Sequence, residues 1–470
     1  MPVVGTSERP LRVAIIGSGP AGFFTAQALQ KQKDRPGLRV RVDMIERLHT
    51  PFGLVRHGVA PDHQKIKAVT AAYEKIAAHE DFRFLGGIHF GEDVGLDDLK
   101  AAYHQIVFCC GAETDRRLGV EGEDLTGSHP ATEFVAWFNG HPDYHAHRFD
   151  LSCERAVVVG VGNVAVDVAR ILLRDPDELA RTDIADHALA ALRESRIREV
   201  VLLGRRGPAQ AAFTNPEAKE LGQLAGVCTS TREDEMALDS ATLESLGPEG
   251  PDKTLARKLV ILESFVGNSP SAGERSLALR FLVSPTRLTG DGEGRVNGVD
   301  LVHNTLLLKS GRLSARPTDR TSHLETGLVF RSVGYRGIPL TGVPFRDDWG
   351  IIPNVKGRVV EQVDGPVCPG LYVAGWIKRG PSGVIGTNKP DAVETVQAML
   401  ADLDADTLHS PAGEQDDALL GHLSSRDVRP TSYRDWRRLD AEELRRGEAG
   451  GRPRVKFVSD TEIREFLESD

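Results

Sequence analysis

Short runs of apolar residues, each followed by a segment with helical spacing, recur along the chain and predict its elements. Runs at 13–16, 40–45 and 105–110 predict buried strands, and amphipathic helical patterns lie between them. The same order returns further along, where runs at 156–159 and 200–203 flank another helical pattern. Because this alternation is typical of parallel sheets covered by helices, we expect an α/β protein.

A glycine-rich loop follows the first predicted strand. Its glycines have the G-x-G-x-x-G spacing, at Gly17, Gly19 and Gly22. Such glycines let the backbone approach a pyrophosphate, whose charge the following helix N-terminus stabilises. Glu46 ends the next strand, 24 residues after Gly22, where a carboxylate accepts the hydroxyls of an adenosine ribose. The first loop with Glu46 therefore predicts a cofactor with a free 2′-hydroxyl, such as FAD or NAD, and not one with a 2′-phosphate. The alternative interpretation is that Glu46 is only a solvated residue at the end of a strand.

A second loop of this kind is followed by a different residue type. Gly160 and Gly162 precede Ala165 in a strand–loop–helix context, and the next strand ends at Arg205 and Arg206. Where an NAD site places an acid, two guanidiniums suit the 2′-phosphate of NADP. The 40 residues from Ala165 to Arg205 exceed the usual spacing, and a predicted helical insert accounts for the excess. A solvated basic turn is the alternative interpretation.

A third glycine-rich segment, residues 376–388, lies between a short predicted strand and a helix expected from about Asp391. Backbone N–H groups at a helix N-terminus can stabilise the charge that a flavin ring gains on reduction, and we assign this role to Val384 and Ile385. Trp376 is expected to cover the ring where a nicotinamide enters, or else to pack in the core.

Two other segments give weaker signals. Residues 229–255 are polar and show no clear period, so we expect them to lie at the surface. Runs at 279–283 and 301–308 predict strands of a hairpin-rich section.

Composition and charge narrow the class of protein. The 470 residues are enough for two or three domains, and the net charge of −10 argues against a nucleic-acid partner. The five cysteines include no C-x-x-C pair, which argues against a disulfide framework, a zinc site and a dithiol redox centre. No apolar run reaches the about 18 residues of a membrane span, and the first residues lack the apolar core of a signal peptide. We expect a cytoplasmic protein with no metal site and no membrane insertion.

Together the motifs resemble those of one family, adrenodoxin reductase and its bacterial relatives, the NADPH:ferredoxin reductases. The resemblance covers nearly the whole chain. Its most specific segments are GSGPAG at 17–22, PFGLVR at 51–56, GVAPDH at 58–63, GNVAVDVAR at 162–170, GRRGP at 204–208, RSVGY at 331–335 and GWIKRGPSGVIGTN at 375–388. The insert RTDIADH at 181–187 and the tail GRPRVK at 451–456 are similar to those of the bacterial branch.

The resemblance implies two Rossmann-like dinucleotide-binding domains, with a discontinuous FAD domain (1–112 and 333–470) and an inserted NADP domain (113–332). The FAD contacts that it implies are Ala21, Glu46, Leu54, Phe90, Trp376, Gly383, Val384 and Ile385. The NADP contacts that it implies are Arg116, Asn163, Val164, Ala165, Val166, Arg205, Arg206, Glu217 and Gly383. The resemblance also implies that His63 and Glu220 form a polar pair near the nicotinamide. This pair has either a role in handling protons or a structural role.

The implied activity is hydride transfer from NADPH to FAD, followed by single-electron transfer to an iron–sulfur ferredoxin that feeds a cytochrome P450 or a similar acceptor. Because ferredoxins are acidic, a local basic patch is expected to bind the partner. The candidate members are Lys219, Arg232, Lys378, Arg379 and Lys389. A FAD- and NADPH-dependent monooxygenase and a non-enzymatic NADP-binding redox sensor remain alternatives.

Overall fold

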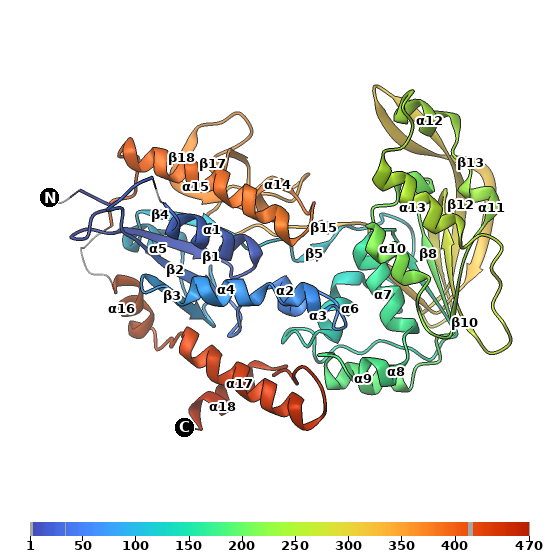
Figure 1. Ribbon diagram of the computed structural model, residues 1–470, viewed down its shortest axis with the longest axis horizontal. Helices are drawn as coiled ribbons and strands as arrows, with labels where there is room; N and C mark the ends of the chain where they lie inside the picture. The colour runs from blue at the N-terminus through green and yellow to red at the C-terminus, as the bar shows by residue number, and fades with distance from the viewer. Residues whose placement is uncertain (1–2, 33, 412–416, 470) are drawn as a thin grey trace.

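The computed structural model describes residues 3–32, 34–411 and 417–469, which form two lobes (Figure 1). The first lobe contains a seven-stranded sheet with the order β16-β17-β18-β4-β1-β2-β3. Its strands are β1 (Leu11–Ile16), β2 (Val40–Glu46), β3 (Phe82–Gly86), β4 (Gln105–Phe108), β16 (Asn354–Val355), β17 (Arg358–Val360) and β18 (Val367–Val373). β1 is buried along its whole length, which agrees with the apolar run at 13–16 and includes the side chain of Arg12.

Two distant parts of the chain build this first sheet. β1 lies between β2 and β4, and all three strands are parallel. β18 adds to the free side of β4, also in parallel, with Leu371 opposite Ile106 and Val373 opposite Phe108. The sheet is therefore continued by a segment that follows the whole second lobe in sequence.

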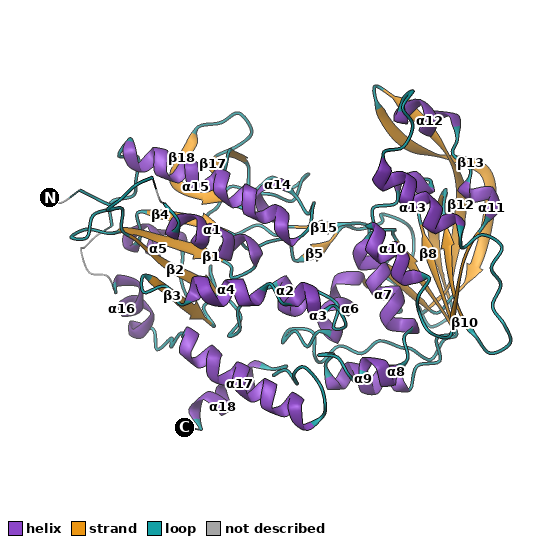
Figure 2. Cartoon of the chain, in the orientation of Figure 1, coloured by secondary structure: helices purple, strands orange, loops and turns teal. Residues whose placement is uncertain are grey.

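Helices cover both faces of the first sheet (Figure 2). On one face, Phe23, Tyr73, Met399 and Trp436 share a core, and each comes from a different helix. On the other face, Leu99 belongs to a second core. The helices of this lobe are α1 (Pro20–Gln30), α2 (Leu54–His57), α3 (Gln64–Lys67), α4 (Thr70–Ala77), α5 (Leu96–Ala102), α14 (Trp376–Arg379), the 3-10 helix η2 (Ile385–Thr387), α15 (Asn388–Asp404), α16 (Ala418–Ser425), α17 (Tyr433–Ala449) and α18 (Asp460–Glu468).

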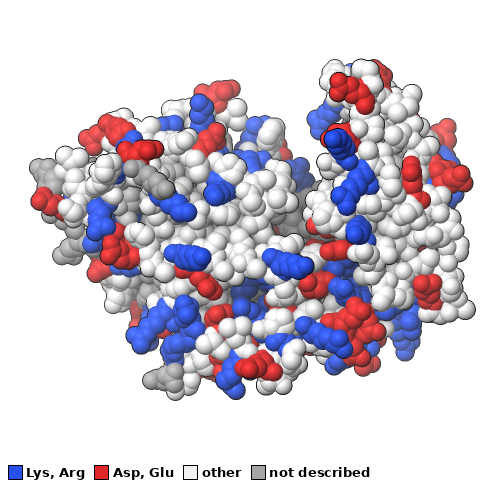
Figure 3. Space-filling view, in the orientation of Figure 1, with Lys and Arg blue, Asp and Glu red and all other residues white. Residues whose placement is uncertain are grey.

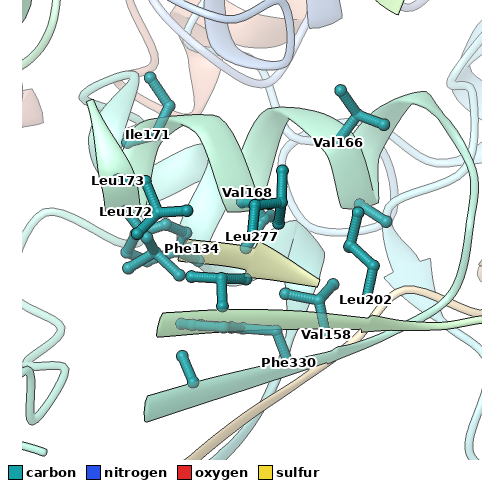
Figure 4. Close-up of a cluster of buried hydrophobic side chains, with 14 of the residues drawn as sticks. Phe134, Val158, Val166, Val168, Ile171, Leu172, Leu173, Leu202, Leu277 and Phe330 are labelled. Atoms are coloured by element: carbon teal, nitrogen blue, oxygen red, sulfur yellow. The ribbon is translucent and has the colours of Figure 1, made fainter. Parts of the chain in front are cut away.

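The second lobe contains a six-stranded parallel sheet with the order β6-β14-β7-β8-β10-β9. Its strands are β6 (Ser128–Pro130), β7 (Arg155–Val159), β8 (Glu199–Leu203), β9 (Val227–Thr231), β10 (Arg275–Arg280) and β14 (Leu328–Arg331). Its helices are α6 (Ala131–Phe138), α7 (Asn163–Leu173), α8 (Pro176–Leu179), α9 (Asp186–Arg193), η1 (Pro208–Gln210), α10 (Asn215–Leu221), α11 (Glu233–Met236), α12 (Ser240–Leu246) and α13 (Lys253–Glu263). Figure 4 shows Val166 and Val168 of α7 in the core with Val158 and Phe330 of the sheet.

A smaller antiparallel sheet extends the second lobe. β12 (Val296–Lys309) lies between β11 (Val283–Gly290) and β13 (Arg312–Glu325) and contains the predicted run 301–308. The predicted run 279–283 is not one hairpin strand, because Leu279 and Arg280 end the parallel strand β10 and only Val283 belongs to β11. Most side chains of residues 229–255 are exposed or half-buried, as expected, but the segment also contains the end of β9, which begins at Val227, and the helices α11 and α12. The strand pairs with β10 and buries only alternate residues, so its sequence contains no apolar run.

Two antiparallel crossovers connect the lobes. β5 (Thr114–Asp115) enters the second lobe and pairs with β15 (Tyr335–Arg336), which returns from it. The C-terminal tail also bridges the lobes, since the Arg452 guanidinium donates to the backbone oxygen of Thr182 at 3.1 Å. Figure 1 shows this tail, in red, running below the first lobe towards α8 and α9.

No helix in the described part of the chain is long and apolar enough to cross a bilayer. Within the same residues, no group of three or more His, Cys, Asp or Glu side chains has an arrangement that could hold a metal ion.

Candidate functional site

A cavity of about 1540 Å³ lies between the lobes and is open to solvent at the cleft visible in Figure 3. Residues that follow the carboxyl ends of β1, β4, β7 and β8 line it. In open parallel α/β sheets this edge is where ligands bind. The two sheets therefore direct their ligand-binding edges into one common space.

The first glycine loop has the geometry of a pyrophosphate cradle. Gly17 has a φ of 105°, and a Cβ added there would lie 2.7 Å from the backbone oxygen of Cys109. A Cβ added at Gly22 would lie 2.2 Å from the Gly17 oxygen, so the loop can close only with glycine at both positions. Nothing lies within 4 Å of a Cβ position at Gly19, the N-cap of α1, which lines the cavity. The start of α1 is thus open to an anion.

The second loop repeats this geometry. Gly160 has a φ of 139°, and a Cβ there would lie 2.1 Å from the backbone oxygen of Ser332. Gly162 is the N-cap of α7, lines the cavity and has open space at its Cβ position. Neither α1 nor α7 has a side-chain cap or an acidic residue in its first turn, so the N-terminal amides of both helices are available to a phosphate.

Glu46 joins the end of β2 to the first loop. One carboxylate oxygen accepts from the backbone N–H of Ser18 at 2.9 Å and from its hydroxyl at 2.7 Å, and the other accepts from the Leu48 N–H at 3.1 Å. The carboxylate also lines the cavity. Because a carboxylate has about four acceptor sites and three are occupied, Glu46 keeps one on Oε1 for a ribose hydroxyl while it fixes the loop.

Arg205 and Arg206 follow β8 and line the same cavity beside the second loop. Neither guanidinium makes an ion pair or a hydrogen bond with another described residue. Burial lowers the pKa of Arg206, and the neighbouring charge of Arg205 lowers it further. Two unpaired like charges held together form a strong site for a phosphate dianion.

The third glycine-rich segment closes over the start of α1. A Cβ at Gly375, which has a φ of 83°, would lie 2.5 Å from the Cβ of Ala21. The helix after this segment begins at Asn388, three residues before the expected Asp391, and the 3-10 turn η2 precedes it. Val384 is the N-cap of that turn, is 56% exposed and lines the cavity.

Trp376 lies at the mouth of the cavity and not in a core. Its ring packs against Tyr335 in a tilted arrangement, with a centroid distance of 5.3 Å and an interplanar angle of 34°, and its indole N–H donates to the Ser382 oxygen at 3.2 Å. Tyr335 belongs to the returning crossover β15, so this contact ties the crossover to the third glycine-rich segment.

His63 and Glu220 meet across the boundary between the lobes. The Nε2 atom of His63 lies 3.0 Å from a carboxylate oxygen of Glu220 and also 3.0 Å from Nη2 of Arg170. Because the pKa of Glu220 is lowered and an ionised carboxylate can only accept, this hydrogen bond requires the proton at Nε2 of His63. Burial alone would lower the pKa of His63, but the hydrogen bond to Glu220 and the charge of Asp167 raise it. The hydrogen bond to His63 lowers the pKa of Glu220 in turn.

Most residues that the sequence singled out line the cavity. They are Gly17, Gly19, Ala21, Glu46, Leu54, His63, Phe90, Arg116, Gly160, Gly162, Asn163, Val164, Arg205, Arg206, Glu217, Trp376, Gly383, Val384 and Ile385. Gly22, Ala165 and Val166 are inside helix turns, where only their backbone is near the loops, and Glu220 stands behind His63. Glu217 lies beside the second loop, where it accepts from the side chains of Asn163 at 3.2 Å and of Thr214.

Sequence reasoning missed two polar groups of the boundary. Arg170 of α7 is buried and pairs with Asp62, with Nη1 2.5 Å from Oδ2, so it links the lobes beside His63. Asp115 on the first crossover lines the cavity and accepts from the Thr132 N–H and hydroxyl, and burial raises its pKa to about 6. Arg170 ends the motif at 162–170 and Asp115 precedes Arg116, but their partners Asp62 and Thr132 are distant in sequence and become visible only in the folded chain.

The residues present fit two dinucleotides. The first loop with Glu46 suits a dinucleotide that has a free ribose 2′-hydroxyl, as FAD has, and the second loop with its two arginines suits NADP. The cavity is continuous between the two loops.

Comparison with known proteins identifies the family. A family model described as pyridine nucleotide-disulphide oxidoreductase matches residues 11–205. NADPH-ferredoxin reductase FprA of Mycobacterium tuberculosis is 45% identical over 464 residues, which cover 97% of this chain and 98% of that protein. Mitochondrial NADPH:adrenodoxin oxidoreductase of Arabidopsis thaliana is 41% identical over 463 residues, or 96% of this chain and 94% of that protein. The structure of M. tuberculosis FprA in complex with NADPH matches with a TM-score of 0.90 and 44% identity, covering 98% of this chain and 99% of that one. The resemblance based on the motifs is thus confirmed, and the chain belongs to the family of NADPH:ferredoxin reductases that includes adrenodoxin reductase.

Proposed function

We propose that this protein is an FAD-dependent NADPH:ferredoxin oxidoreductase. The observation that supports it best is that two nucleotide loops open into one cavity and are followed by opposite charges. Glu46 favours a free ribose hydroxyl at the first loop, and Arg205 and Arg206 favour a 2′-phosphate at the second. When bound, FAD accepts two electrons as a hydride and can release them one at a time, which matches a nicotinamide donor to an iron–sulfur acceptor.

The proposal assigns FAD to residues 1–112 and 333–470, and NADP to residues 113–332. The sheets support this division, because β18 completes the first sheet and β14 the second. The residues proposed to hold FAD are Gly17, Gly19, Ala21, Gly22, Glu46, Leu54, Phe90, Trp376, Gly383, Val384 and Ile385. Those proposed to hold NADP are Arg116, Gly160, Gly162, Asn163, Val164, Ala165, Val166, Arg205, Arg206 and Glu217, with Gly383 shared.

The chain contributes binding and orientation to this reaction. Hydride transfer needs no acid or base, so His63 and Glu220 are proposed to set the charge and shape of the boundary and to hold a proton at Nε2 of His63. Trp376, at the mouth of the cavity, is proposed to lie where the nicotinamide enters. In that position its ring would help to hold the two reacting rings close together, which is the contribution that orientation makes to such a reaction.

The ferredoxin is proposed to dock through exposed lysines near the cleft. Lys219 and Lys389 are exposed and have no ion pair with a described residue. Lys378, by contrast, is buried and pairs with Asp391 at 3.1 Å and Glu394 at 2.8 Å, so it is withdrawn from the patch. Arg232 and Arg379 are also neutralised by carboxylates, at 3.1 Å and 3.2 Å.

Two finer statements complete the proposal. The reduced ferredoxin is proposed to supply single electrons to an acceptor such as a cytochrome P450. A cytoplasmic location is proposed because all five cysteines are unpaired, as is typical of reducing compartments.

The direct test is an electron-transfer assay with the purified yellow protein, NADPH, a ferredoxin and cytochrome c. We expect cytochrome c reduction to depend on added ferredoxin and to be much faster with NADPH than with NADH. Reduction that is independent of ferredoxin, together with NADPH-dependent insertion of oxygen into a substrate, would support a monooxygenase and overturn the proposal. NADPH binding without electron transfer to any acceptor would support a redox sensor.

A further inference from the structure

A turn of the second lobe, residues 141–146, follows α6 and lies against the first lobe. A carboxylate oxygen of Asp143 in this turn lies 2.8 Å from Nη2 of Arg47, which directly follows β2. The ring of His141 packs edge-on against the ring of His57, the last residue of α2, with a centroid distance of 4.9 Å. Figure 1 shows α6 close to α2 and α3, where the lobes meet. Two side-chain contacts therefore join this turn to the first lobe.

Hydrogen bonds within the turn hold Asp143 in place. The His141 N–H donates to the Ala136 oxygen at 2.9 Å, and the Tyr144 N–H donates to the His141 oxygen at 3.0 Å. The Asp143 N–H donates to Nδ1 of His141 at 3.2 Å, and burial lowers the pKa of His141 to about 4, so this nitrogen can accept at neutral pH. The turn thus presents the carboxylate of Asp143 to Arg47 from a fixed position.

The order of strands in the first sheet gives the direction of a bound FAD. Glu46 ends β2 on one side of β1, and the third glycine-rich segment follows β18 on the other side. A dinucleotide whose pyrophosphate lies at the start of α1 therefore extends its ribose and adenine over β2 and β3, and its flavin towards β18. Beyond Glu46 on the β2 and β3 side, the cavity is lined by Arg47, His89 and Phe90. The adenosine half of FAD is thus expected beside Arg47.

Both lobes form the wall of the cavity at this end. His141 and Tyr144 of the turn line the cavity, as do Arg47 and His57 of the first lobe. Asp143 lies outside the lining, so it acts on the cavity through Arg47 and not through a contact with a ligand.

We propose that the turn at 141–146 covers the adenosine half of bound FAD and that the Arg47–Asp143 ion pair holds this cover closed. The inference rests on the proposed FAD site of the first lobe. Asp143 is then a positioning residue, which retains FAD without touching it, because the adenosine half can leave only after the ion pair between the lobes has opened. The lobe that binds NADP thereby helps to hold the cofactor of the other lobe.

A general link between the lobes is the competing interpretation of this ion pair. The buried pair of Lys67 and Asp183 is such a link, and neither of these two described residues lines the cavity. Arg47 differs from them, because it lines the cavity and directly follows Glu46, the residue proposed to bind the ribose. A pair that only joined the lobes would affect both nucleotides alike, so the two interpretations predict different results.

The test measures how fast FAD leaves the holoprotein after dilution, from the rise in flavin fluorescence. For Asp143→Asn, which keeps the shape of the side chain, we expect release about 3- to 5-fold faster than from the parent protein at low salt. Sodium chloride at about 1 M should accelerate release from the parent and remove the difference, because a partly exposed ion pair is screened. The matched control, Asp404→Asn, breaks the exposed ion pair with Arg35 and should release FAD like the parent.

A double-mutant cycle separates the ion pair from any direct contact between Arg47 and FAD. Arg47→Ala should release FAD at least as fast as Asp143→Asn, and the double variant should be no faster than Arg47→Ala, because the loss of either partner already breaks the pair. Calorimetric titration of the holoprotein with adenosine 2′,5′-bisphosphate should give the same affinity for Asp143→Asn as for the parent, since this ligand reports on the NADP site.

Three results would overturn the inference. Asp143→Asn could release FAD at the parent rate at low salt, or its effect could add fully to that of Arg47→Ala, or it could weaken adenosine 2′,5′-bisphosphate as much as FAD, as a general link would. A protein that holds FAD as expected but does not reduce ferredoxin would refute the proposed function and leave this test intact. A protein that binds no FAD would refute the proposed FAD site itself.

Discussion

Lys67 and Asp183 form a buried ion pair across the boundary between the two lobes, with Nζ 2.8 Å from both carboxylate oxygens. Lys456 of the C-terminal tail shares the same carboxylate at 3.2 Å and donates to the Asn139 oxygen at 3.0 Å. Burial would raise the pKa of Asp183, but the charges of Lys456 and Lys67 lower it to about 2. One carboxylate thus joins both lobes and the tail.

Removal of this carboxylate should strongly destabilise the protein. Asp183→Asn leaves two buried ammonium groups without a counter-charge, and breaking a buried pair in this way costs about 3–5 kcal/mol. Urea unfolding monitored by circular dichroism measures the loss. The matched control is Asp404→Asn, which removes the exposed ion pair with Arg35 and should cost under about 1 kcal/mol. Equal effects of the two variants would show that the boundary cluster does not hold the lobes together.

Replacement of Glu46 should weaken FAD binding. Glu46→Ala removes both the anchor of the first loop and the acceptor proposed for the ribose, so we expect about 10-fold weaker binding of FAD. The ratio of flavin to protein absorbance after gel filtration, and titration of the apoprotein with FAD, measure this change. The surface variant Glu80→Ala serves as the control. Full retention of FAD by Glu46→Ala would contradict the assignment of the first loop.

The arginine pair should set the choice between NADPH and NADH. In the double variant Arg205→Ala and Arg206→Ala we expect the KM for NADPH to rise about 10- to 100-fold and that for NADH to change little. Steady-state kinetics with both nucleotides gives the comparison. An equal rise for the two nucleotides would show that the arginines act on structure and not on the 2′-phosphate.

The His63–Glu220 pair should make the stability of the boundary depend on pH. The pKa of His63 is raised in the folded protein. Its contribution to the free energy of unfolding is therefore complete at pH values below the ordinary histidine pKa of about 6.5, and it is lost as the pH rises through the pKa of the folded state. Glu220, whose pKa is lowered, contributes above its ordinary value of about 4.3. The difference in unfolding free energy between the parent and Glu220→Gln should therefore be largest between pH 5 and 6 and shrink towards pH 9.

Titration of His63 by NMR provides an independent measurement of the same pair. In Glu220→Gln the pKa of His63 should fall, because the hydrogen bond that raises it is weakened. An unchanged pKa would assign the shift to Asp167 alone.

Docking of ferredoxin should depend on charge at Lys219 and Lys389. Reversal of both to Glu should raise the KM for ferredoxin several-fold at low salt, and the effect should diminish at high salt because exposed charges are screened. The kcat with ferricyanide, a small acceptor, checks that NADPH oxidation is intact. A KM for ferredoxin that is unaffected at low salt would place the docking surface elsewhere.

The parts of the site that could be predicted from sequence are those formed within one strand–loop–helix–strand unit. Gly17, Gly19 and Glu46 lie in one strand–loop–helix–strand unit, where spacing fixes geometry. Arg205 could be predicted despite its long separation from Ala165, because α8 and α9 form a compact insert that leaves β7 and β8 adjacent.

Contacts between distant segments could not be predicted in this way. Lys67, Asp183 and Lys456 are far apart in sequence, and each looks like an ordinary solvated charge until the lobes come together. Lys378 shows the opposite error. Its position next to a glycine-rich turn suggested an exposed cation that could bind ferredoxin, but its side chain is buried and pairs with Asp391 and Glu394. The burial of a charge depends on partners that local patterns do not contain.

The most direct test of the central claim follows the flavin absorbance near 450 nm without oxygen, as NADPH and then oxidised ferredoxin are added. We predict that NADPH bleaches the flavin rapidly, that NADH does so poorly, and that about two one-electron ferredoxins per NADPH restore the absorbance. The contrary result would be that NADPH bleaches the flavin, that ferredoxin does not restore its absorbance, and that oxygen with an organic substrate does. This result would contradict the claim that electrons pass from the second nucleotide site through the first to ferredoxin.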